Sequence, residues 1–115
     1  MKVNVRFKGL PTSESLAEYT TRRAHQHLSR FGHRVSAVDV RLCDVNGPRG
    51  GRDKRCLFTV RVPGLSTLQI EELDESFYAA VDQAALRAAR SLGRNLERSR
   101  RHQAAETAAR EGGTS

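Results

Sequence analysis

The sequence predicts a two-layer α+β domain, in which a four-stranded mixed sheet carries two helices packed on one face. Four short segments alternate apolar and polar residues, as strands with one buried face do. Two longer segments repeat apolar residues three and four positions apart, as amphipathic helices do. The segments follow one another in the order β-α-β-β-β-α. A single sheet covered by both helices on one side buries all these apolar faces and leaves its other face open and polar.

The first strand is expected over residues 1–7, where apolar and polar residues alternate. Residues 9–13, Gly-Leu-Pro-Thr-Ser, break the strand and supply a hydroxyl that can cap a helix. That helix is expected to run to about Arg30, and Gly32 is suited to end it. His27 falls on its apolar side, where we expect a packed side chain rather than a metal ligand. A helix between two strands of one sheet makes those strands parallel.

Three further strands are expected over residues 35–43, 55–62 and 67–73 from the same alternation. Pro63-Gly64 has the residues that a type II turn requires between the last two strands. Residues 44–53 consist of turn formers, and their spacing does not match a calcium-binding EF-hand loop. We interpret this stretch as a mobile basic loop. The basic residues in and after it are Arg49, Arg52, Lys54 and Arg55.

The second helix is expected over residues 74–102, with Asp74 as its cap and Glu75 in its first turn. On a helical wheel it carries two stripes. The apolar stripe consists of Phe77, Val81, Ala84, Ala88 and Leu92. The basic stripe consists of Arg87, Arg90, Arg94, Arg98 and Arg101. Because this helix is longer than the strands, its first half can dock on the sheet and its second half must project.

After His102 the sequence has no apolar face and ends in Gly-Gly-Thr-Ser. Residues 103–115 are therefore expected to form a disordered tail, and the folded domain is expected to span residues 1–102.

Charge is the strongest functional signal. The 115 residues carry a net charge of +7, and 17 of the 20 basic residues are arginine. Arginine suits bidentate phosphate contacts, although a GC-rich genome would produce the same bias. The acids gather at residues 71–82, whereas the basic stripe has almost no interleaved glutamate to limit repulsion. The pattern favours binding to RNA or DNA over a merely solvated face, an acidic protein or a lipid surface.

Other chemistries find little support. The chain has no Gly-rich phosphate loop and no metal-ligand motif, so neither a cofactor nor catalysis is expected. The acids Glu71, Glu72 and Asp74 could form a carboxylate site, but helix capping explains most of them. Cys43 and Cys56 are expected to be reduced structural residues, with a cross-strand disulfide as the alternative. The N-terminus is not a signal peptide and no segment could span a membrane, which predicts a cytoplasmic protein.

Three motifs resemble the ribosome hibernation-promoting factors, the family that includes ribosome-associated inhibitor A. They are residues 13–23 (SESLAEYTTRR), residues 60–64 (VRVPG) and residues 77–82 (FYAAVD) followed by spaced arginines. The resemblance covers about residues 1–96. It implies a non-catalytic factor that binds the small ribosomal subunit in the mRNA channel, over the decoding sites for tRNA, and silences and preserves idle ribosomes. Its partner would be 16S-type rRNA, with no membrane or small-molecule substrate, and it would be monomeric off the ribosome.

Carried over by position, the family resemblance implies rRNA contacts at a set of arginines. They are Arg22, Arg23, Arg87, Arg90 and Arg94. Lys54 and Arg55, at the end of the basic loop, complete the expected RNA-binding set. Tyr78 and Asp82 match the third motif, but the sequence suggests no role for them. The alternative function is a general module for double-stranded or other RNA that is not specific to ribosomes.

Overall fold

The computed structural model describes residues 1–45 and 53–113, with side chains up to residue 109. Its elements are β1 (Lys2–Lys8), α1 (Glu14–Leu28), the 3-10 helix η1 (Ser29–Arg34), β2 (Ala37–Asp44), β3 (Lys54–Arg61), β4 (Leu68–Asp74) and α2 (Phe77–Gly113). This is the predicted β-α-β-β-β-α order. Most of the predicted basic loop, with Arg49 and Arg52, lies outside the described residues.

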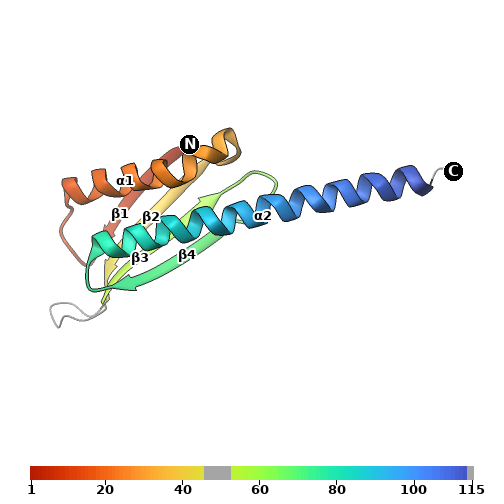
Figure 1. The fold of residues 1–115 in the computed structure, drawn as a ribbon. Helices are drawn as coiled ribbons and strands as arrows, with labels where there is room; N and C mark the ends of the chain where they lie inside the picture. The colour runs from red at the N-terminus through yellow and green to blue at the C-terminus, as the bar shows by residue number, and fades with distance from the viewer. Residues whose placement is uncertain (46–52, 114–115) are drawn as a thin grey trace.

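The four strands form one mixed sheet in the order β1-β2-β3-β4. β1 pairs with β2 in parallel, and β2–β3 and β3–β4 pair antiparallel. Both helices cover the same face of the sheet, and the long α2 lies beside α1 (Figure 1). The two-layer α+β fold predicted from the sequence is confirmed.

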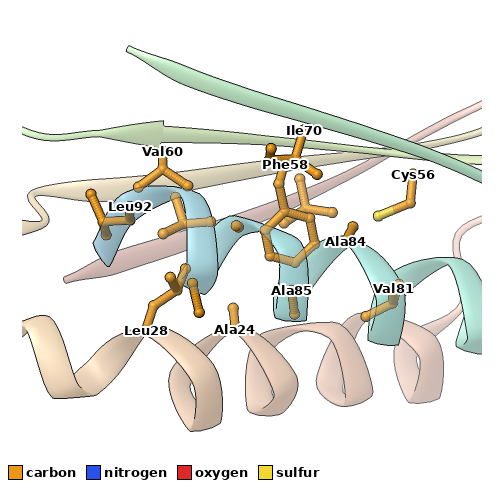
Figure 2. Packing of buried hydrophobic residues seen from close by; sticks show 14 of the residues in the cluster. Ala24, Leu28, Cys56, Phe58, Val60, Ile70, Val81, Ala84, Ala85 and Leu92 are labelled. Carbon is orange, nitrogen blue, oxygen red and sulfur yellow. The ribbon is translucent and has the colours of Figure 1, made fainter. Parts of the chain in front are cut away.

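The core lies between this sheet face and the two helices. α2 contributes mostly small buried side chains to it. They include Ala80, Ala84, Ala85, Ala88 and Ala89. Small residues let the helix lie close to the sheet, and the large groups come from the strands, above all the fully buried Phe58. Ala24 and Leu28 of α1 complete the packing against α2 (Figure 2).

Two glycines have backbone conformations that matter, one in η1 directly after the first helix and one in the turn between β3 and β4. α1 begins after Ser13, whose Oγ accepts a hydrogen bond from the Leu16 backbone N–H at 3.3 Å. It ends at Leu28 rather than near Arg30, because the chain tightens into η1, inside which Gly32 has a φ of 58°. Gly64 has a φ of 87°, and the Leu65 N–H donates to the Val62 carbonyl at 3.0 Å, as the predicted type II turn requires.

The start of the second helix differs from the prediction. Asp74 is the last residue of β4, and Glu75 precedes the helix. Ser76 is the cap, because its Oγ accepts hydrogen bonds from the backbone N–H groups of Tyr78 and Ala79 at 3.2 and 3.4 Å. Asp74 Oδ1 instead accepts a hydrogen bond at 3.1 Å from the backbone N–H of Ser76, the residue before the helix.

The second helix also extends further than predicted, to Gly113 rather than His102. Its alanines favour helix, and the pairs Arg101–Glu97 and His102–Glu106 link successive turns. The last buried residue of α2 is Leu92, and Leu96 is only partly buried, so the remainder projects from the domain (Figure 1). The disorder expected for residues 103–115 in solution stays a prediction. No helix in the described ranges is long and apolar enough to cross a membrane.

The sheet register rules out the cross-strand disulfide left open by the sequence. Cys56 pairs with Leu42 and points into the core, whereas Cys43 pairs with Arg55 on the other face. Both thiols are free, and burial raises the pKa of Cys56. Alternation along a strand sends these two side chains in opposite directions.

Candidate nucleic-acid interface

Arg22 and Arg23 are adjacent in α1 but project in different directions. The α1 residues Leu16, Thr20, Ala24 and Leu28 are buried in the core between the sheet and α2. Arg22 therefore projects on the β1 side, where it lines a shallow depression with Val5. Arg23 projects toward α2 instead. Residues one apart on a helix diverge by about 100°, so the predicted Arg22–Arg23 pair does not form one contact point.

Asp82 fastens α1 to α2. Its Oδ1 accepts a hydrogen bond from the Tyr19 hydroxyl at 2.6 Å and another from Arg23 Nε at 2.8 Å. The Tyr78 ring packs edge-on against the Tyr19 ring, with 4.8 Å between centroids. The hydrogen bond to Asp82 raises the pKa of Tyr19, and burial raises it further. This cluster gives Tyr78 and Asp82 the role that the sequence did not suggest, which is to hold the helices together and orient Arg23.

Beside this cluster a groove of about 240 Å³ runs between the helices. It is lined by Gln26, His27, Arg30, Leu86, Ala89 and Arg90. His27 is half-buried, as predicted, and its Nε2 is buried without a hydrogen-bond partner. Burial lowers the pKa of His27, and the nearby Arg23 charge lowers it further. The groove is therefore basic through its arginines, while its histidine favours the neutral form.

The arginines of α2 differ in how firmly they are held. Arg87 Nη1 donates to Glu72 Oε1 at 2.6 Å and to the Glu71 carbonyl at 3.0 Å, which ties this side chain to β4. Arg94 donates only to Ser91 Oγ, at 3.2 Å. Arg90 is exposed and makes no hydrogen bond or ion pair with any described residue. Among the described residues, Arg90 and Arg98 are thus the members of the predicted stripe that keep all their donors available to a partner.

Lys54 and Arg55 lie apart from the helical arginines. Lys54 Nζ lies 2.7 Å from Asp44 Oδ2 and 3.4 Å from Asp53 Oδ1. The hydrogen bond to Asp44 raises the pKa of Lys54. Arg55 projects from the opposite face of the sheet, where its Nη2 donates to Glu71 Oε2 at 3.0 Å. Both cations are already engaged with carboxylates of the same domain.

The acids of the β4–α2 junction have structural partners rather than a catalytic arrangement. Glu71 accepts from Arg55, Glu72 from Arg87 and Asp74 from the Ser76 N–H. Side-chain pairing, more than helix capping, explains this cluster. Within residues 1–45 and 53–113, no group of three or more acidic, histidine or cysteine side chains could hold a metal ion.

The seven predicted contact residues thus form no single patch. Arg90 lines the interhelical groove, and Arg23 is held beside it by Asp82 and by Gln26, which lines the groove. Arg87 is tied to β4, and Arg94 lies about two turns further along α2. Arg30, which is not one of these seven residues, lines the groove from η1.

The fold defines the chain as a small basic α+β domain, in which two arginine-bearing helices cover one side of a sheet. Residues 3–100 match the family model described as "Sigma 54 modulation protein / S30EA ribosomal protein". The chain belongs to this family, which bears out the resemblance seen in its sequence. No curated protein is similar enough in sequence to count as a match.

Two solved structures share the fold. One is a ribosomal subunit interface protein from Coxiella burnetii, with a TM-score of 0.68 and 20% identity over 82% of this chain and 96% of that one. The other is the N-terminal domain of Protein Y from Thermus thermophilus, with a TM-score of 0.67 and 23% identity over 82% of this chain and 98% of that one.

Proposed function

We propose that this chain binds the small ribosomal subunit through rRNA phosphates, in the mRNA channel and at the tRNA decoding sites. By occupying these sites it silences and preserves idle ribosomes in the cytoplasm. The observation that carries the proposal is the match of residues 3–100 to a family of ribosomal proteins. The fold shared with a ribosomal subunit interface protein supports it, as does the net charge of +7.

The chemistry of the helical layer suits phosphate groups. A guanidinium has five N–H donors, so Arg23 and Arg87 retain free donors after pairing with Asp82 and Glu72. Those carboxylates hold the two arginines in place and so reduce the entropy lost on binding. Arg90 and Arg94 have no carboxylate partner among the described residues and can pair with phosphates directly. These contacts would read the rRNA backbone rather than its bases.

Sedimentation with purified ribosomes tests the proposal. We expect the protein to comigrate with small subunits in a sucrose gradient at low salt and to bind free duplex RNA more weakly. Remaining at the top of the gradient would refute ribosome binding. Equal affinity for free duplex would instead support a general RNA-binding module.

The salt dependence of ribosome affinity tests the helical contacts. With about five phosphates contacted, log affinity should fall against log salt with a slope of roughly −4. Replacing Arg87, Arg90 and Arg94 by Gln should make the slope shallower by about 2, because each lost contact removes about 0.7–0.9. The matched variant with Lys at the same positions keeps the charge and should keep the slope. A Gln variant with an unchanged slope would show that the stripe is only solvated.

A further inference from the structure

The face of the sheet that points away from the helices is strongly basic. Alternation along the strands assigns its side chains, and the register aligns them in rows across the sheet. The basic ones are Lys2, Arg6, Lys8, Arg41, Arg55 and Arg61, and the acidic ones are Asp39 and Glu71. Both acids already accept hydrogen bonds. Asp39 accepts from Asn4 and Arg61, and Glu71 accepts from Arg55. The face therefore has a surplus of positive charge that its own carboxylates do not neutralise.

Arg6 and Arg41 are the centre of this surplus. They lie directly opposite each other in the parallel register of β1 and β2, and both are exposed. Like charges at directly opposite positions destabilise a sheet. Neither arginine forms a hydrogen bond or an ion pair within the part of the chain that the structure describes. An anion bound between them would relieve this repulsion.

A hollow of about 300 Å³ lies at this pair. Arg61, Thr59 and Gln69 line it together with Arg6 and Arg41. Asp39 lines it too, paired with Arg61 at 3.1 Å. The hydroxyl of Thr59 and the amide of Gln69 add neutral hydrogen-bond donors to the guanidinium groups. The hydrogen bond from Asn4 and the Arg61 guanidinium hold the pKa of Asp39 below its ordinary value, so the carboxylate stays ionised beside these two partners. The hollow has the donor set that a phosphate group requires.

We propose that this open sheet face is a second phosphate-binding surface, which holds a single RNA strand by its backbone through Arg6 and Arg41. The proposal rests on the proposed function and adds a contact on the side opposite the helices. Basic side chains extend beyond the hollow, from Lys2 to Lys8 along β1, over roughly 20 Å. This length suits successive phosphates of a strand better than one free anion. The face has no aromatic side chain for base stacking, so the contacts are to the backbone.

The test measures affinity for a short unstructured RNA by fluorescence anisotropy over a range of salt concentrations. Arg6→Gln/Arg41→Gln should make the log–log salt slope shallower by about 1.4, because each single-strand phosphate contact contributes about 0.7. The matched control Arg34→Gln/Arg100→Gln removes the same charge from exposed arginines away from this face and should change the slope less. Equal changes in the two variants, or none in the first, would overturn the proposal.

Three further measurements identify the source of the phosphate, test direct pairing with it and separate the two proposals. Inorganic pyrophosphate and ATP supply free phosphate groups, and competition by either at concentrations near that of the protein would overturn the RNA-strand assignment. The Arg6→Lys/Arg41→Lys variant keeps the charge and should keep the slope, and a flattened slope would contradict direct phosphate pairing. If the wild-type protein does not sediment with small subunits, the ribosomal function fails while the anisotropy result still decides the second surface.

Discussion

At the scale of single residues, one carboxylate oxygen joins the two helices. Asp82 Oδ1 accepts from Tyr19 and Arg23, which lie 63 and 59 positions earlier in the chain. The sequence motif marked Asp82 and Tyr78 but gave them no role, because periodicity describes contacts within one helix and not between helices. The same limit applies to Arg87, whose partner Glu72 lies on a neighbouring strand.

Replacing Asp82 by Asn should destabilise the domain by about 1–2 kcal/mol, measured as the free energy of unfolding in urea. The expected loss is modest because the side chains of Arg23 and Asp82 are 31% and 39% exposed, so solvent screens their interaction. Tyr19→Phe should cost about 0.5–1.5 kcal/mol, since it removes one hydroxyl donor.

The control for the Asp82 prediction is Glu75→Gln, an exposed acid before the same helix, which should change stability by less than about 0.5 kcal/mol. In the double variant Asp82→Asn/Tyr19→Phe the two losses should not add fully, because both act on one hydrogen bond, which Asn weakens by removing the charge and Phe removes altogether. Full additivity would mean that the two residues act independently and that Asp82 does not fasten α1 to α2 through Tyr19.

At the scale of elements, the period of the apolar residues predicted which segments form strands, which form helices and which face of each is buried. Every expected strand and both helices form, and the apolar stripe from Val81 to Leu92 is buried. The ends were less predictable. Ser29–Arg34 forms a 3-10 helix where the sequence suggested only a stop at Gly32. The sequence predicted Asp74 as the cap of the second helix, but the cap is Ser76. The reason is that β4 continues to Asp74, which pairs with Lys54 of β3.

Ser76→Ala should lower stability by about 1 kcal/mol, because it removes the oxygen that accepts from the Tyr78 and Ala79 N–H groups. Ser76→Asp retains an acceptor and places a negative charge at the helix N-terminus, so it should retain most of the stability. Thermal unfolding of both variants gives the comparison. An equal loss for Ala and Asp would show that the cap contributes little and that packing alone sets the start of α2.

At the scale of the whole molecule, the positive charge is spread over two layers. From the sequence, the seven predicted contact residues were expected on the two helices and at the end of the basic loop, and five of the seven lie on the helices. The open sheet face was predicted to be polar, but the alignment of Arg6 with Arg41 depends on strand order and register. Both come from the three-dimensional pairing of β1 with β2. Charge counted along the chain cannot distinguish the two sides of a sheet.

The last prediction concerns the projecting end of α2. The molecule extends 68 Å along its longest axis but only 23 and 18 Å along the others, because this helix continues beyond the core. Residues 103–109 are all exposed, and the family match ends at residue 100. Helical segments this short are marginal in water without packing partners. We therefore expect this end to contribute nothing to the stability of the domain.

Truncation after His102 should change the free energy of unfolding by less than about 0.5 kcal/mol. Hydrogen exchange should find the amides of residues 103–109 unprotected in the full chain. Leu96→Ala is the matched comparison, because Leu96 is partly buried against the core. This substitution should lower the free energy of unfolding by about 1–2 kcal/mol, below the range for fully buried leucines. A truncation as costly as Leu96→Ala would mean that the end of α2 packs against the protein in solution, and the domain would then extend past residue 102.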